Sequence, residues 1–74
     1  LKRAGETAAF GLRMPGGWYF EQFLEVTGFD LRQEWSTELE RLVGDGWGHR
    51  DQQGFRLTPS GLRFADAAAE LFLR

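Results

Sequence analysis

The fold is decided by the stretch FRLTPSGLRFADA (residues 55–67), in which a strand pattern runs directly into a helix pattern. Phe55 and Leu57 alternate with polar residues, as in a half-buried strand. The Thr58 side chain can cap a following helix, and Pro59 suits the first helical position, where a missing N–H costs nothing. We therefore expect a strand that is joined to a helix within one residue, at a fixed angle.

A second strand pattern lies just upstream, over residues 47–51, and residues 52–54 can form the turn between the two strands. This arrangement predicts a β-hairpin of residues 47–51 and 55–58. Before it, Gly46 stands where a left-handed residue ends a helix, so that Trp47 can pack back on Leu42.

Three helix patterns precede the hairpin. The first covers residues 1–14 and is ended by Pro15, Gly16 and Gly17; the second covers residues 19–27 and is ended by Gly28; the third runs from the N-cap Asp30 to Asp45. Each has an apolar face at helical spacing. These faces are Ala4, Ala8 and Leu12 in the first, Phe20, Phe23, Leu24 and Thr27 in the second, and Trp35, Leu39, Leu42 and Val43 in the third. The order predicts a mainly α, winged-helix-like domain of three helices, a small β-hairpin and a C-terminal helix.

The last helix, predicted over residues 59–73, carries two apolar stripes. One consists of Leu62, Ala65, Ala69 and Phe72, and the other of Phe64, Ala68 and Leu71. A helix at the edge of a monomer needs only one such stripe. The stripe of Phe64, Ala68 and Leu71 is therefore either part of a wide core contact or a domain-docking surface.

Composition sets the class of protein. With 74 residues, the chain has room for a single small domain, residues 1–74, and its 42% of hydrophobic residues exclude a disordered chain. It has no cysteine, which excludes disulfides and thiolate metal sites within this chain and fits a cytoplasmic protein. No apolar run reaches the roughly 20 residues of a membrane span. Because the chain begins with Leu1 rather than Met, we expect it to be a segment of a longer protein.

The winged-helix order suggests a nucleic-acid reader, but the charges argue against it. The net charge is −2. The third helix would occupy the recognition position, and it carries Asp30, Glu34, Glu38, Glu40 and Asp45 against only Arg32 and Arg41. Affinity for a phosphate backbone depends on basic residues that release counterions. We therefore expect no nucleic-acid partner, and a winged-helix module for nucleic acid or protein is the alternative interpretation.

No catalytic or metal site is predicted. His49 is the only histidine, and it has neither a second ligand nor an orienting acid near it in the pattern, so it is interpreted as a half-buried strand residue. Glu34, Glu38 and Arg41 are spaced along one helix face and are interpreted as solvated.

Two residues near the first turn are candidate substrate-binding residues. Arg13 either favours the C-terminus of its helix electrostatically or presents its guanidinium to an anionic group such as a carboxylate. Trp18 is either a core residue or a flat apolar wall for a ligand or a neighbouring domain.

Three segments in this order resemble a known family. They are ETAAFGLRMPGGW (residues 6–18), LERLVGDGW (residues 39–47) and RLTPSGLRFADAAAELFL (residues 56–73). Together they resemble the C-terminal domain of the oxygen-independent coproporphyrinogen III oxidase family, including its haem chaperone relatives (HemN/HemW). Arg13 matches the arginine of the family's GLR motif, whereas Trp18 stands where a smaller aliphatic residue is expected.

The resemblance implies a parent protein in porphyrin or haem biosynthesis with an N-terminal radical-SAM barrel. That barrel would hold a [4Fe–4S] cluster through three cysteines and would bind S-adenosylmethionine; this chain would hold neither. The chain would be an accessory, non-catalytic domain that covers the barrel near porphyrin or haem. Whether the parent is an oxidase or a haem chaperone stays open.

Overall fold

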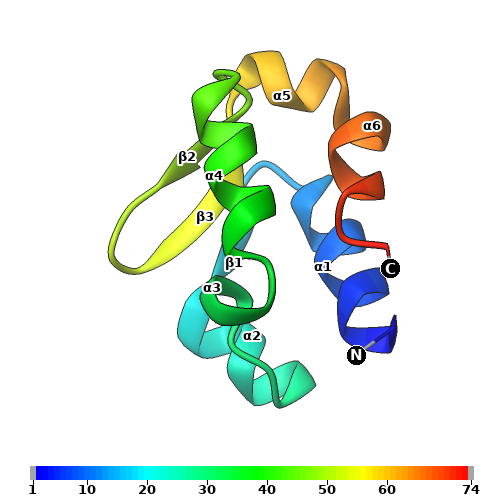
Figure 1. Ribbon diagram of the computed structural model, residues 1–74, viewed down its shortest axis with the longest axis vertical. Coiled ribbons are helices and arrows are strands. Elements are labelled where there is room, and N and C mark those ends of the chain that lie inside the picture. The colour runs from blue at the N-terminus through cyan, green and yellow to red at the C-terminus, as the bar shows by residue number, and fades with distance from the viewer. Residues whose placement is uncertain (1, 74) are drawn as a thin grey trace.

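The predicted hairpin is present in the structure, a computed structural model that describes residues 2–73 (Figure 1). Strand β2 (Gly48–Arg50) pairs antiparallel with strand β3 (Gly54–Leu57), with His49 opposite Arg56. The Asp51 carboxylate closes the turn, because its Oδ1 accepts the backbone N–H groups of Gln53 and Gly54, both at 2.8 Å. These hydrogen bonds, that from Gln53 first, hold the pKa of the Asp51 carboxyl below its usual range.

A third strand, which the sequence did not predict, completes the sheet. Strand β1 (Trp18–Tyr19) pairs antiparallel with β3, with Trp18 opposite Phe55 and Tyr19 opposite Gly54, so that the order is β1-β3-β2. A strand of two residues is too short to show an alternating pattern. The small β-hairpin is therefore the larger part of a three-stranded antiparallel sheet.

The expected joint between strand and helix is confirmed. Helix α5 (Pro59–Arg63) begins two residues after β3 ends, and its first residue is a proline. The Thr58 Oγ1 accepts the Gly61 N–H at 3.1 Å as the N-cap. The Thr58 N–H also donates to the Trp47 carbonyl at 2.8 Å, which fixes the joint to the start of the hairpin.

The remaining helices are α1 (Lys2–Leu12), α2 (Phe20–Thr27), α3 (Leu31–Glu34), α4 (Ser36–Gly44) and α6 (Ala65–Glu70). The first helix ends at Leu12, before the expected Met14; its expected start, residue 1, lies outside the described residues. The third and the last helix were each predicted as one continuous helix, which is wrong, because each is divided into two. Trp35 (φ −127°, ψ 33°) divides α3 from α4, and Phe64 (φ −119°, ψ 35°) divides α5 from α6. Neither break involves proline or glycine, so the sequence gives no signal for it.

The predicted caps are confirmed. The Asp30 Oδ1 accepts the Arg32 backbone N–H at 2.9 Å and so caps α3. At the end of α4, Gly46 has φ of 78°, and the Trp47 N–H donates to the Leu42 carbonyl at 2.9 Å. This is a Schellman ending, in which the left-handed residue is a glycine because other residues are strained there.

The core is built around Trp35, whose ring lies edge-on to Phe23 at 6.0 Å between centroids and 6.0 Å from Phe72. Its buried members are Ala4, Ala8, Leu12, Phe20, Phe23, Leu31, Trp35, Leu39, Leu42, Phe55, Leu57, Ala68 and Phe72. Two residues expected on buried faces were wrongly placed, because Leu24 is 46% exposed and Val43 is 43% exposed.

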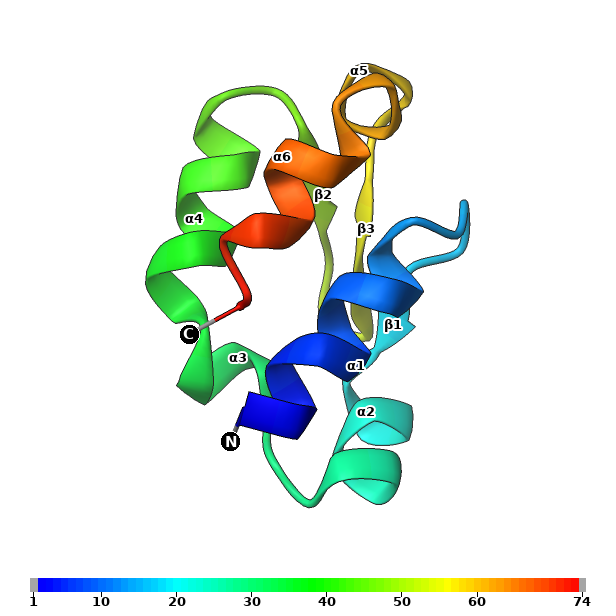
Figure 2. The ribbon, with the colours of Figure 1, turned by 90° about the vertical axis from the view of Figure 1, so that its right-hand side faces the viewer.

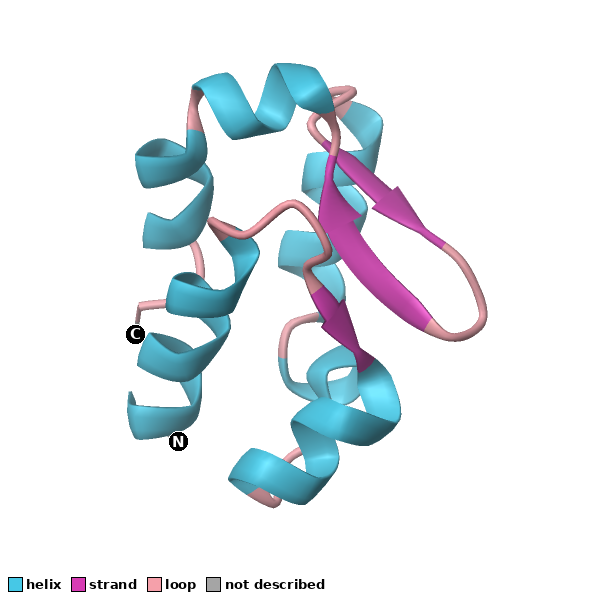
Figure 3. Ribbon diagram, turned by 180° about the vertical axis from the view of Figure 1, so that it is seen from behind, coloured by secondary structure: helices cyan, strands magenta, loops and turns pink. Residues whose placement is uncertain are grey.

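Small residues allow α1 and the C-terminal segment to approach closely. Figures 1 and 2 show α6 beside α1 on one side of the molecule, away from the hairpin. A Cβ atom added at Gly5 would collide with the Phe72 carbonyl. Figure 3, the view from behind, shows the sheet on the side of the molecule opposite α1 and α6. The molecule therefore has two separate faces, one formed by α1 and α6 and one by the hairpin and α3–α4.

Candidate functional site

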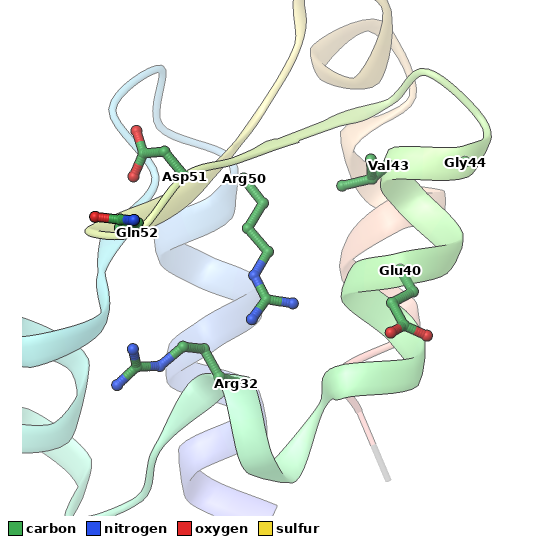
Figure 4. A pocket seen from close by; sticks show the side chains of 7 residues that line it. All are labelled: Arg32, Glu40, Val43, Gly44, Arg50, Asp51 and Gln52. Carbon is green, nitrogen blue, oxygen red and sulfur yellow. The ribbon is translucent and has the colours of Figure 1, made fainter.

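An open groove of about 750 Å³ lies between the hairpin tip and the α3–α4 segment (Figure 4). It forms because the hairpin folds back beside α3 and α4. Its lining residues are Arg32, Glu40, Val43, Gly44, Arg50, Asp51 and Gln52.

Two arginines line this groove. Arg32 comes from α3 and Arg50 from β2, and Figure 4 shows Arg50 extending from the hairpin toward α3, while the Arg32 side chain runs sideways from α3. The Arg32 Cζ lies 4.7 Å and the Arg50 Cζ 5.8 Å from the ring centroid of Phe20. Phe20 is buried and borders an adjoining hollow, and both contacts are within the range of cation–π attraction.

The two arginines differ in their anionic partners. The Arg32 Nε and Nη2 donate to Oδ1 and Oδ2 of Asp30, both at 3.2 Å. This side-chain hydrogen bonding is the main reason why the pKa of the Asp30 carboxyl lies below its usual range. Within residues 2–73, no carboxylate forms an ion pair with Arg50. Among the described residues, Arg50 therefore has a cation–π contact with Phe20 and no ion pair.

The groove continues past Arg32 toward α2. An adjoining hollow of about 510 Å³ shares Arg32 and Gln52 with it and is walled by Tyr19, Phe20 and Leu24 among others. Tyr19 and Leu24 are both exposed. The cationic centre is thus flanked by apolar side chains, with Val43 on the α4 side.

The comparison with protein families gives a match that covers most of the chain. The model of the HemN C-terminal domain matches residues 2–64. The chain belongs to the HemN C-terminal domain family. Neither a curated protein nor a solved structure matches the chain. The resemblance seen in the sequence is thereby confirmed at the level of the family, and the chain is associated with HemN-like proteins.

In this HemN C-terminal domain, Arg13 lies outside the groove. Its Nη2 forms an ion pair with the Asp66 Oδ1 at 3.2 Å, and both side chains are at least half exposed. The pair connects the segment after α1 to the first turn of α6. The structure thus gives the GLR arginine a bridging role at the surface, and an anionic ligand would have to compete with Asp66.

Trp18 is held by the domain itself. Its Nε1–H donates to the Ala8 carbonyl at 3.2 Å, and its ring lies edge-on to Phe23 at 5.2 Å between centroids. A Cβ at Gly11 would collide with the indole, so the glycine of GLR makes room for it. Trp18 also borders a hollow of about 130 Å³ beside His49. Most of its surface is used for packing the loop on α1.

The predicted docking stripe is not one continuous surface. Ala68 is fully buried in the core, which corrects its assignment to a surface. Leu71 is partly buried against the same core, whereas Phe64 is 51% exposed and stacks on Trp47 at 5.1 Å between centroids. The break at Phe64 explains the difference, because α6 turns so that Ala68 faces inward.

The other residues that the sequence singled out do not form a site. His49 is exposed on β2, and the break at Trp35 separates Glu34 from the helix of Glu38 and Arg41, contrary to the expected single face. The described residues contain no cluster of three or more His, Cys, Asp or Glu side chains suited to a metal ion. No helix between residues 2 and 73 combines the length and apolar character that a membrane crossing requires.

The proximity of Arg32 and Arg50 to one aromatic ring was not predicted from the sequence. The two residues are 18 positions apart and lie in different elements. The winged-helix order was the available signal, since it places the hairpin beside the third helix. The two arginines do not form part of a continuous basic surface, because Asp30, Glu40 and Asp51 lie around them.

Proposed function

We propose that this HemN C-terminal domain is an accessory, non-catalytic domain that covers the radical-SAM barrel of a parent protein in porphyrin or haem biosynthesis. The match of residues 2–64 to the HemN C-terminal domain carries the proposal. The parent is a coproporphyrinogen III oxidase-like enzyme or a haem chaperone, and it works in the cytoplasm.

The redox chemistry belongs to the barrel. A [4Fe–4S] cluster is held by cysteine thiolates, and this chain has none, so its residues do not fit the cluster. S-adenosylmethionine and the tetrapyrrole are likewise assigned to the parent. The role left to the domain is mechanical: to shield the barrel opening from water and to order the segments around it.

Exposed apolar side chains support a covered face on the side of α1 and α6. Phe10 is 67% exposed on α1, and Met14, one turn further along, is also exposed. Phe64 is exposed where α5 meets α6. The Arg13–Asp66 ion pair joins the two segments that carry these side chains. Exposed large apolar side chains on neighbouring segments are expected where one domain contacts another.

The test uses the full-length parent with the double change Phe10→Ser and Met14→Ser. We expect it to lower the midpoint of thermal unfolding of the parent by several degrees and to speed proteolysis between the domains, because the docked surface loses apolar contact. In the isolated 74-residue chain the same changes should leave the midpoint almost unaltered, since both side chains are exposed there.

Val26→Ser is the matched control, because Val26 is an equally exposed apolar residue on α2. Val26→Ser should leave the midpoint of thermal unfolding of the parent and its rate of proteolysis unchanged. A parent whose stability and proteolysis are the same with and without the double change would refute the docked face.

A further inference from the structure

We propose that the groove between Arg32, Arg50 and Phe20 is a binding site for a small organic carboxylate with an apolar body. The site is separate from the α1–α6 face, because its lining residues belong to the hairpin and α3–α4 (Figure 4), and Figure 1 shows these elements on the other side of the molecule from α1 and α6. It therefore stands whether or not the docking proposal holds.

The charge arrangement calls for an anion. Two guanidinium groups are directed at one ring, where their like charges repel each other. Asp30 offsets the charge of Arg32 and accepts hydrogen bonds from the Arg32 Nε and Nη2, so the Arg32 Nη1 takes no part in these bonds. Arg50 has no ion-pair partner among residues 2–73. A carboxylate placed between Arg50 and the Arg32 Nη1 would relieve the repulsion and receive hydrogen bonds from both.

The nearby acidic groups favour a carboxylate over a more highly charged anion. The Asp51 carboxylate is engaged by the Gln53 and Gly54 N–H groups and points away from the arginines in Figure 4. Glu40, however, lines the α4 side of the groove. Because Asp30 offsets the charge of Arg32 and Glu40 lies across from Arg50, a second negative charge on the ligand would gain little further attraction. Guanidinium groups also match the planar carboxylate in their geometry.

The walls account for the apolar body of the ligand. Val43 lines one side of the arginines, and Tyr19 and Leu24 line the adjoining hollow on the other side. The two spaces, of about 750 and 510 Å³, have the size of sites that hold small organic molecules. A flat aromatic ring attached to the carboxylate could lie along either wall.

The experiment is a titration of the ¹⁵N-labelled 74-residue chain with 2-naphthoate at low salt, followed by NMR. We expect saturable shifts of the side-chain N–H signals of Arg32 and Arg50 and of the Gln52 backbone amide, with a Kd on the order of 1 mM. The neutral 2-naphthamide should bind about tenfold more weakly, and inorganic phosphate should also bind more weakly.

Variants assign the effect to the guanidinium pair. Arg50→Gln should weaken naphthoate binding about fivefold, and Arg50→Lys should weaken it less, because it keeps the charge but loses the planar fork. Arg63→Gln, at an exposed arginine of α5, is the control and should bind like the unaltered chain. Retention of the backbone amide spectrum shows that each variant is folded.

Three results would overturn the proposal. The absence of saturable shifts up to about 20 mM naphthoate would remove the site. Equal binding of the naphthamide would show that the site does not recognise the carboxylate. Phosphate binding as tight as that of naphthoate would show that the apolar body of the ligand contributes nothing.

Discussion

The Thr58 hydroxyl donates a hydrogen bond of 2.7 Å to the Gly46 carbonyl. The same oxygen accepts the Gly61 N–H as the N-cap of α5. One side chain therefore links the residue that ends α4 to the first turn of α5, across the base of the hairpin. This link explains why the strand and the helix in residues 55–67 meet at a fixed angle.

Replacement of Thr58 by Val should destabilise the domain by about 1–2 kcal/mol, because valine has the shape of threonine but neither donates nor accepts. The measurement is urea unfolding followed by circular dichroism. Thr58→Ser keeps the hydroxyl and should stay within about 0.5 kcal/mol of the unaltered chain. Equal stabilities of the Val and Ser variants would show that the link contributes nothing.

Gly46 and Gly44 form a matched pair for the end of α4. A Cβ atom would meet open space at both positions, but only Gly46 has a positive φ, of 78°. Gly46→Ala should therefore cost about 1 kcal/mol through backbone strain, whereas Gly44→Ala should stabilise the domain by up to about 1 kcal/mol. Changes of the same sign, measured by urea unfolding, would contradict the Schellman ending.

The Asp30–Arg32 interaction should appear in the dependence of stability on pH. The pKa of the Asp30 carboxyl is lowered in the folded state, mainly by the Arg32 side chain. Its contribution is therefore present above the unfolded pKa of about 3.9 and is lost as the pH falls through the lower folded value.

The Asp30→Asn variant isolates this contribution, because asparagine keeps the N-cap and loses the charge. At pH 7 it should be less stable by about 0.5–1 kcal/mol, a modest value because the Arg32 side chain is 44% exposed. The difference should fade as the pH falls well below 4. A difference that persists unchanged at low pH would show that the ion pair is not its cause.

The domain should bind nucleic acid weakly. The chain has a net charge of −2, and acidic residues surround the Arg32–Arg50 pair. Gel-shift assays with duplex DNA at low salt should give a Kd no tighter than about 10⁻⁴ M. Tight, salt-sensitive binding that Arg50→Gln abolishes would favour the alternative of a winged-helix reader.

The features that the sequence predicts well are local. The caps at Asp30, Gly46 and Thr58 each depend on hydrogen bonds between residues no more than five positions apart. Their signals are residue types at fixed offsets, such as an aspartate before a helix or a glycine after one. Tertiary packing need not be known to find them.

The features that were missed depend on tertiary packing. Strand β1 has two residues, and only its pairing with β3 defines it. The breaks at Trp35 and Phe64 keep the apolar spacing but turn the chain, so Ala68 faces the core and not the surface. The groove of Arg32 and Arg50 likewise exists only after the hairpin folds back.

The most direct test of a covering domain is hydrogen–deuterium exchange of α1 in the full-length parent and in the isolated 74-residue chain. We expect the amides around Phe10, and those around Phe64, to exchange at least about tenfold more slowly in the parent, because docking suppresses local opening there. The amides of the hairpin tip, residues 52–54, should exchange equally in both proteins. Equal exchange around Phe10 in both, or protection of the tip in its place, would contradict the proposed role.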